Sequence, residues 1–452
     1  MDSRLKDMTT GHPLKLMTQF ALPLMVGNLF QQLYTVVDTA VVGQALGVAA
    51  LAALGASDWL NWMFLGMVQG VTQGFSIPMA HSFGGRQMEQ LKKVIRQSLL
   101  LSALCALLFL TVGQLIAVPL LTLLKTPADI LPNTILYIRV ILVGLPVVMA
   151  YNLFSAILRS MGDSKTPLYA MIVASVTNIL LDLLFVLGFR WGIAGAAAAT
   201  VIAQVVSSVI CLVQLKKLGV MDFHHGDFRP NGSMAKELLR LGSPMAFQNL
   251  IIAIGGMIVQ SVVNRCGVTF LAGFTATNKM YGLLEIAAIS YGYSMVTYVG
   301  QNLGARKIKR IRQGVRAANL LGLGIAVIVA GVMIAFGKSI VGMFISGTPT
   351  QIAEATEIGY RYLCVMSLFL PVLYYLYVTR AAIQGAGNAV LPMLSGVVEF
   401  IMRTIVILVL PRLIGSEGVF YAEVAAWMGA DVVLFISYHC VMAKITRQYQ
   451  EP

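Results

Sequence analysis

The sequence predicts an all-α, polytopic membrane protein with twelve transmembrane helices in two six-helix lobes. Three observations predict this fold class: the composition is apolar, stretches of bilayer-spanning length recur along the chain, and the two halves of the sequence repeat each other. Of the 452 residues, 58% are hydrophobic and only 11% are charged, against about a quarter charged in an ordinary soluble domain. A soluble fold of this composition would expose a large apolar surface to water, so we expect the chain to lie in a membrane.

Twelve hydrophobic stretches of the sequence have roughly the 20 residues that a helix needs to cross a bilayer core about 30 Å thick. Apolar residues lie on nearly all sides of each stretch, and Gly and Ala are scattered through them. This pattern favours helices packed against helices and lipid over the strands of a barrel. In chain order, the expected spans are 17–42, 52–80, 94–118, 133–158, 166–189, 192–215, 238–264, 270–300, 314–336, 357–384, 390–411 and 418–442.

Basic residues gather in alternate loops between these spans. Most of the 32 Lys and Arg residues lie in the N-terminal tail, the even-numbered loops and the C-terminal tail. Because basic residues are retained on the cytoplasmic side of a membrane, we expect both termini in the cytoplasm and the protein in a bacterial inner membrane or plasma membrane. The formal charge of +13 is then explained by the orientation of the chain in the membrane. The expected partner is the lipid bilayer, not a nucleic acid.

The two halves of the chain look like copies at an offset near 220 residues. Pro23 then falls close to Pro244, and the turn at 84–86 meets the turn at 304–306. Each copy has six helices, so both enter the membrane from the same side, and parallel repeats of this kind usually place the substrate between two bundles. The expected domains are an N-terminal lobe (1–218), a cytoplasmic linker (219–236) and a C-terminal lobe (237–452).

Two aspartates lie in the middle of apolar stretches, Asp38 in the first span and Asp182 in the fifth. A carboxylate at this depth costs roughly 2.5–3.5 kcal/mol on insertion scales, so it usually faces a polar interior and marks an ion or substrate pathway. When the halves are aligned, Asp38 meets Val259, and the counterpart of Asp182 lies in the apolar run 405–410. We therefore predict a transporter whose coupling site is in the N-terminal half.

Polar residues at helical spacing accompany the two aspartates. Asn178 precedes Asp182 by four residues, and Tyr34 precedes Asp38 by four, so each pair projects from one helix face. In the sixth span, Thr200 follows a run of Gly and Ala that permits close helix approach. The predicted ion-coupling residues are Asp38, Asn178, Asp182 and Thr200, and the predicted cavity residues nearby are Tyr34 and Asn152.

Two ions suit this cluster of oxygen atoms. Hard cations such as Na⁺ prefer carboxylate, carbonyl and hydroxyl ligands, so the four residues would form a metal site if the protein is sodium-coupled. A proton is equally suitable, because two neighbouring carboxylates can hold one proton between them. The sequence leaves H⁺ and Na⁺ open and predicts no cofactor. A purely structural role also stays open for Asn152, Asn178 and Thr200, since such residues commonly bond across helices.

The motifs around these residues resemble a known family. Pro23 with the run VDTAVVG at 37–43, the loop RSMGDSKTP at 159–167, and the Asn178 and Asp182 pair are similar to multidrug and toxic compound extrusion (MATE) transporters, most of all to the branch of the DNA-damage-inducible F (DinF) proteins. The resemblance implies a twelve-helix antiporter whose lobes form a V and which exports organic cations against an inward Na⁺ or H⁺ gradient. It also implies that the four predicted residues bind the ion and that Pro23 is a hinge.

Polar residues in the second half are further candidates for the substrate cavity: Gln248 in the seventh span, Glu285 in the eighth and Glu399 in the eleventh. For Glu399 the alternative is an ion pair with Arg403, which lies four residues further on along one helix face. We expect the substrates to be small organic compounds, mostly cationic or amphipathic, and the protein to be a monomer.

Two other classes of function compete with multidrug export. A flippase or exporter of lipid-linked sugars or another amphipathic metabolite would be expected to face anionic head groups with several Arg or Lys residues, and the expected spans hold few. An enzyme or an ATP-driven pump would need a nucleophile with a base, an HExxH motif or a GxxxxGK[ST] loop, and the sequence offers none. The prediction is secondary active multidrug efflux, with the flippase or metabolite exporter as the alternative and no enzymatic activity.

Overall fold

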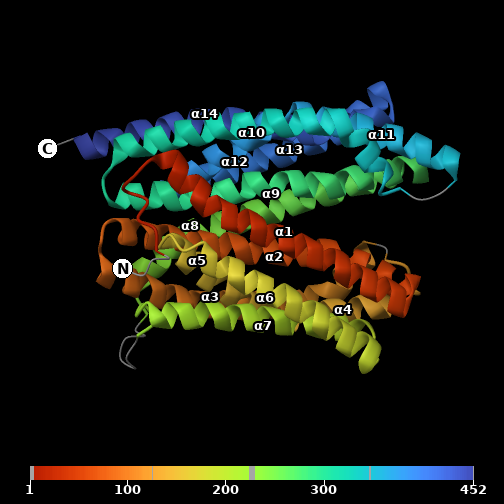
Figure 1. The fold of residues 1–452 in the computed structure, drawn as a ribbon, viewed down its shortest axis with the longest axis horizontal. Coiled ribbons are helices and arrows are strands. Elements are labelled where there is room, and N and C mark those ends of the chain that lie inside the picture. The colour runs from red at the N-terminus through yellow and green to blue at the C-terminus, as the bar shows by residue number, and fades with distance from the viewer. Residues whose placement is uncertain (1–4, 125, 223–229, 346–347, 451–452) are drawn as a thin grey trace. The chain divides into compact units, whose positions relative to one another are not determined.

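The computed structural model describes residues 5–124, 126–222, 230–345 and 348–450, and within these ranges every regular element is a helix (Figure 1). The first half holds α1 (Pro13–Leu46), α2 (Val48–Gly84), α3 (Met88–Leu123), α4 (Leu131–Val143), α5 (Leu145–Ser160), α6 (Lys165–Asp182), the π-helix η1 (Leu183–Gly188) and α7 (Ile193–Lys217). The second half holds α8 (Gly232–Val263), α9 (Val268–Gly304), α10 (Ile308–Gly342), α11 (Pro349–Leu368), α12 (Leu370–Gly385), α13 (Val390–Ile414), the 3-10 helix η3 (Ser416–Phe420) and α14 (Tyr421–Gln450).

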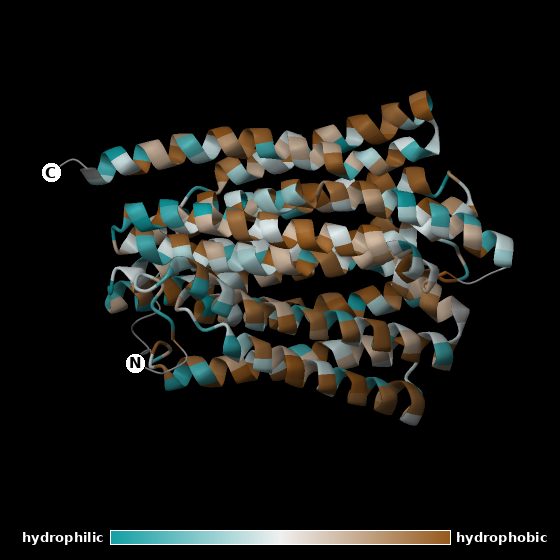
Figure 2. Cartoon of the chain, turned by 45° about the horizontal axis from the view of Figure 1, so that its top comes forward, coloured by the Kyte–Doolittle hydropathy of each residue, from teal (hydrophilic) through white to brown (hydrophobic). Residues whose placement is uncertain are grey.

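Each of the twelve expected spans coincides with a helix or a helix pair of the described residues. Hydrophobic residues run along most of the length of the helices (Figure 2). By length and composition, eight helices of the described part could cross a membrane, or up to ten if each bent pair forms one span. The remaining two expected spans are α2 and α9, helices of 37 residues each. The predicted all-α, polytopic fold class is confirmed.

Two expected spans are bent. The span predicted at 133–158 is the pair α4 and α5, bent by 46°, and the span predicted at 357–384 is the pair α11 and α12, bent by 49°. In both pairs the second helix has a proline in its first turn, Pro146 in α5 and Pro371 in α12. Proline has no N–H to donate and clashes with the preceding turn of a helix, so the bend falls where the sequence places the proline.

The chain forms two compact units, Met1–Met8 with Leu22–Leu250, and Thr9–Ala21 with Ile251–Pro452. The long helices α1 and α8 therefore each contribute to both units, with α1 changing unit next to Pro23. The domains expected at 1–218 and 237–452 follow the sequence repeat and not the contacts, so they stay a prediction. Part of the expected linker, residues 223–229, lies outside the described residues.

Glycines bring α2 close to the first part of α8 within the first unit. A Cβ atom on Gly70 would lie 2.5 Å from the backbone N of Ala246, and one on Gly74 would lie 2.5 Å from Cα of Gly242. One turn earlier on α2, the carbonyl of Gly66 accepts a hydrogen bond of 2.7 Å from Asn249 Nδ2. Small residues permit this backbone approach between membrane helices, so Gly70 and Gly74 allow α2 and α8 to pack closely.

Candidate ion and substrate site

Two aspartates on different helices of the first unit lie next to each other. Asp38 is on α1 and Asp182 is the last residue of α6, and they are 7% and 0% exposed. Their carboxyl groups are close enough to hydrogen-bond with each other once one of them holds a proton. Within the described residues no donor reaches Oδ1 of Asp38 or either carboxyl oxygen of Asp182. Two buried carboxylates without donors are costly, so this pair is suited to receive a positive ion or a proton.

The helix changes type directly after Asp182. Residues Leu183–Gly188 form the π-helix η1, and the backbone N–H of Phe189 donates to the carbonyl of Leu184 at 2.8 Å, five residues back. The ring of Phe185 stacks against Trp191, with ring centroids 4.8 Å apart, and against Phe189 at 5.9 Å. Short π-helical turns are rare and frequently occur at functional sites, and this one lies next to the buried carboxyl pair.

Asn178 and Thr200 form a second pair of predicted residues. Nδ2 of Asn178, on α6, donates to Oγ1 of Thr200, on α7, at 3.4 Å, and Thr200 Oγ1 donates to the carbonyl of Ala196 at 3.2 Å. Asn178 is 1% exposed, and its Oδ1 meets no donor among the described residues. Because Asn178 lies one helical turn from Asp182, α6 connects the two pairs.

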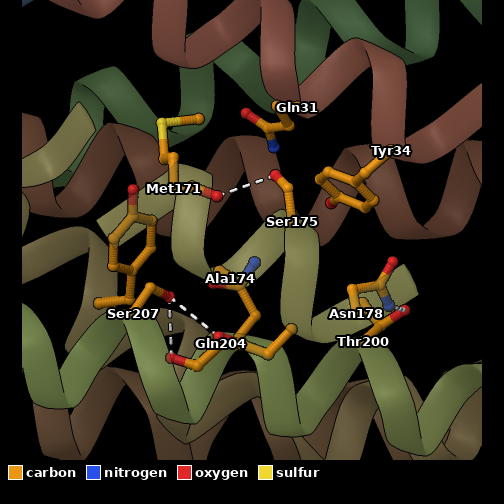
Figure 3. Close-up of a pocket in the computed structure, with 11 residues that line it drawn as sticks. Gln31, Tyr34, Met171, Ala174, Ser175, Asn178, Thr200, Gln204 and Ser207 are labelled. Atoms are coloured by element: carbon orange, nitrogen blue, oxygen red, sulfur yellow. Dashed lines mark hydrogen bonds between the residues drawn. The ribbon is translucent and has the colours of Figure 1, made fainter. Parts of the chain in front are cut away.

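A pocket lies beside these residues, between α1, α5, α6 and α7 (Figure 3). Its wall holds amides, hydroxyls and apolar side chains: Gln31, Tyr34, Tyr151, Met171, Ala174, Ser175, Asn178, Thr200, Ala203, Gln204 and Ser207. Asn178 and Thr200 therefore belong both to the pocket wall and to the predicted ion site. A ligand in the pocket and an ion at the carboxyl pair would share these two side chains.

The other predicted residues of the first unit differ in position. Tyr34 lines the pocket, whereas Asn152 is not among the described residues of its wall. Nδ2 of Asn152 donates to the carbonyl of Val148 within α5 at 2.8 Å. Gln248 is 2% exposed and lies on the part of α8 that belongs to this unit. Pro23 lies inside the continuous helix α1. The functional roles of these residues stay predictions.

Sequence reasoning misses two polar residues of this unit. The carboxyl group of Asp58, an exposed residue on α2, is close enough to Asp38 for an electrostatic interaction. Gln204 lines the pocket, and its Oε1 is without a donor in the described part of the chain. Both carry a signal that the sequence contains: Asp58 is an acid within an apolar stretch, and Gln204 follows Thr200 by four residues.

The predicted acids of the second unit have partners. Glu399 accepts hydrogen bonds from Arg380 at 2.7 Å and from Arg403 at 3.0 Å, so the ion pair that the spacing of Glu399 and Arg403 predicts is present. Arg403 also donates to Glu423 at 2.7 Å, a link between α13 and α14 that sequence spacing does not reveal. Glu285 accepts hydrogen bonds from the hydroxyl groups of Tyr377 and Tyr281.

Comparison with known proteins places the chain in a family. The MatE family model matches residues 23–184 and 244–409, one stretch in each half of the chain. The chain belongs to the MatE family. This MatE protein is 26% identical over 446 residues to "Probable multidrug resistance protein YpnP" of Bacillus subtilis, covering 98% of this chain and 99% of that protein. It is 29% identical over 346 residues to "Probable multidrug resistance protein YoeA" of the same organism, covering 74% of each chain.

A solved structure has the same fold. It is described as the outward-facing conformation of a multidrug resistance MATE family transporter of the MOP superfamily, and it matches this MatE chain with a TM-score of 0.90 at 23% identity, covering 99% of each chain. Membership of the family confirms the prediction of an efflux transporter and not an enzyme. The chain is therefore a multi-pass membrane protein and an ion-coupled antiporter of small-molecule substrates.

Proposed function

We propose that this MatE transporter exports cationic amphipathic compounds in exchange for a monovalent cation that binds between Asp38 and Asp182. The observation that carries the proposal is the buried carboxyl pair, three of whose four oxygen atoms have no donor among the described residues. The pair lies beside a pocket whose described wall has no charged side chain. A wall that combines hydroxyl, amide and apolar groups suits uncharged and amphipathic parts of organic molecules. A flippase for lipid-linked sugars is less well supported, because the described pocket wall offers no Lys or Arg to an anionic head group.

The unpaired oxygen atoms support Na⁺ over H⁺ as the coupling ion. Oδ1 of Asp38, both carboxyl oxygens of Asp182 and Oδ1 of Asn178 are without donors in the described part of the chain. A single proton shared by the two carboxyl groups would act as donor to one acceptor, whereas Na⁺ is coordinated by several carboxylate, carbonyl and hydroxyl oxygens at once. We therefore propose Na⁺ as the coupling ion, with H⁺ as the alternative.

The ion and the substrate are proposed to be coupled through shared residues. Ion binding at the carboxyl pair would reorient Asn178 and Thr200, which also form the pocket wall. A ligand drives a transporter between states only by binding one state more tightly than the other, and coupling of two ligands is reciprocal. We propose that the ion favours the state that releases substrate, and that α1 adjusts at Pro23, where a helix hydrogen bond is missing.

The orientation and the oligomeric state belong to the same proposal. The concentration of Lys and Arg residues in the terminal tails and the even-numbered loops supports two cytoplasmic termini in a bacterial inner membrane or plasma membrane. Each proposed binding residue lies within a single unit of one chain, which supports a monomer as the transporting form.

The test is transport by purified protein in proteoliposomes loaded with a fluorescent organic cation. We expect an imposed Na⁺ gradient to drive exchange of the dye, and a K⁺ gradient of the same size to leave the dye distribution unchanged. A tenfold ion gradient supplies about 1.4 kcal/mol, enough for a clear shift in dye distribution. Exchange driven by a pH gradient alone would identify H⁺ as the ion, and normal coupled exchange by Asp38→Asn would refute the site.

A further inference from the structure

Helix α10 changes from basic to apolar along one exposed face. Lys309, Arg312 and Arg316 are exposed, and their spacing of three and four residues places them on one side of the helix. Continuing along the same side, Leu320 and Leu323 are 62% and 48% exposed, followed by exposed Val327. The opposite side of α10 is buried in the unit. One exposed face of the helix thus carries three positive charges followed by an apolar stripe.

The end of α14 adds two more positive charges. Lys444 and Arg447 are exposed, α10 and α14 are in contact, and Nη2 of Arg312 donates to Oγ1 of Thr446 at 2.7 Å. In Figure 2 the end of α14 nearest the C-terminus is hydrophilic. We call the five residues Lys309, Arg312, Arg316, Lys444 and Arg447 the α10–α14 basic patch. All of them belong to the second unit.

Among the described residues, no acidic side chain forms an ion pair with the α10–α14 basic patch. The sequence has no Asp or Glu in residues 302–345 or 432–450. Two neighbouring basic residues have other roles, because Nζ of Lys307 donates to the carbonyl of Thr9 at 2.8 Å and Nε of Arg310 donates to Oδ1 of Asn302 at 3.1 Å. The five residues of the patch are exposed. They form a dense positive surface at one end of a helix whose next turns are apolar and exposed.

We propose that the α10–α14 basic patch binds the head group of an anionic phospholipid whose acyl chains lie along the apolar stripe of α10. Clusters of Lys and Arg at the membrane surface attract anionic lipid head groups, and the charges of the patch are complementary to a phosphate. The stripe from Leu320 to Val327 continues from the patch for about 10 Å at 1.5 Å per residue. A soluble phosphate would use the charges and leave this stripe without a role, so the geometry favours a lipid.

The repeat in the first half lacks part of this arrangement. At an offset of 220 residues, Lys309 corresponds to Glu89 at the start of α3, while Arg312 and Arg316 correspond to Lys92 and Arg96. A carboxylate at this position would repel a phosphate. The second unit is therefore expected to bind anionic lipid more tightly than the repeat-related surface of the first unit.

The experiment is native mass spectrometry of the purified full-length protein after addition of equal amounts of phosphatidylglycerol and phosphatidylcholine. The patch variant combines three substitutions in the α10–α14 basic patch: Lys309→Gln, Arg316→Gln and Lys444→Gln. The control variant removes three exposed positive charges of the first unit instead: Arg86→Gln, Lys93→Gln and Lys217→Gln. We expect the patch variant to retain phosphatidylglycerol between about tenfold and a hundredfold less than the wild-type protein, since each basic residue near the surface contributes several-fold. The control variant should lose much less.

Two further measurements keep the proposal open to refutation if the patch variant is poorly folded. In the wild-type protein, raising the salt to about 1 M should remove the preference for phosphatidylglycerol, because charges are screened over roughly 3 Å at that ionic strength. Excess glycerol 3-phosphate should leave the bound lipid in place. The proposal is overturned if the wild-type protein retains both lipids equally, if the two variants lose phosphatidylglycerol equally, or if glycerol 3-phosphate displaces the lipid.

Discussion

The carboxyl group of Asp38 on α1 lies beside that of Asp182 at the end of α6, and no donor of the described residues reaches three of their four oxygen atoms. A buried carboxylate without a partner is stable only when a positive ion or a proton accompanies it. With a positive ion or a proton bound, the pair carries less negative charge than without it. The two forms therefore differ strongly in charge, as ion-driven transport requires.

Replacing Asp38 by Asn is expected to abolish coupled export. The amide introduced by Asp38→Asn would donate a hydrogen bond to Asp182 and remove one of the two negative charges, so the ion would no longer bind with useful affinity. Transport in proteoliposomes under an imposed ion gradient should fall to the level of empty liposomes, while the amount of protein in the membrane is unchanged. Asp129→Asn, an exposed acid in the turn between α3 and α4, is the control and should transport normally. Coupled export by the Asp38 variant would contradict the assignment.

Sodium is expected to stabilise the wild-type protein against heat. An ion that binds only the folded state adds about 2.7 kcal/mol to the free energy of unfolding at a concentration one hundred times its dissociation constant. The melting temperature in NaCl should therefore exceed that in KCl at equal ionic strength. The difference should vanish in Asp182→Asn, because that variant lacks one ligand and one charge. If NaCl and KCl give the same melting temperature for the wild-type protein, Na⁺ is excluded as the tightly bound ion.

The helix positions could be predicted from the sequence because a bilayer fixes the length of each apolar stretch. The details of the backbone could not be predicted from the sequence. Nothing in the run from 183 to 188 distinguishes a π-helix from a continued α-helix, and Pro146 and Pro371 mark a bend without giving its angle. The change of unit within α1 depends on tertiary contacts that one sequence does not contain.

The site was predictable where the cost of a buried charge makes a residue stand out. Asp38 and Asp182 are conspicuous because acids are rare within membrane spans, and the same rule applies to Asp58. Partners on other helices are harder to find. The spacing of Glu399 and Arg403 predicts their ion pair, but the bonds to Arg380 and Glu423 join distant parts of the chain and have no local signature.

The glycine contact between α2 and α8 predicts a contrast between two conservative substitutions. A methyl group on Gly74 would lie 2.5 Å from Cα of Gly242, whereas no described atom lies within 4 Å of a methyl group on Gly55 in the same helix. Overpacking of this kind typically costs about 1–3 kcal/mol. Gly74→Ala should therefore lower the melting temperature in detergent, and Gly55→Ala should leave it unchanged or raise it slightly. Equal melting temperatures for the two variants would show that α8 moves away from α2 without cost.

The ion pairs of Glu399 with Arg380 and Arg403 predict that replacing Glu399 lowers the stability of the protein and leaves its substrate affinity unchanged. Glu399 is 4% exposed and pairs with two buried arginines, Arg380 and Arg403, so Glu399→Gln leaves buried positive charge uncompensated, which typically costs about 3–5 kcal/mol. Glu357→Gln is the matched control, because it removes an acid that pairs with Lys338 at 2.8 Å on the exposed surface of the same unit, where ion pairs contribute little.

Melting in detergent and binding of a fluorescent organic cation below the melting temperature separate the two roles of Glu399. The structural role predicts a much lower melting temperature for Glu399→Gln than for Glu357→Gln, with unchanged dye affinity in the folded fraction. A substrate role predicts the reverse, a weakened affinity at nearly normal stability, because a carboxylate that attracts a cationic drug would not have its charge already compensated by two arginines. The observed pairing, with Glu423 holding Arg403 from α14, favours the structural role.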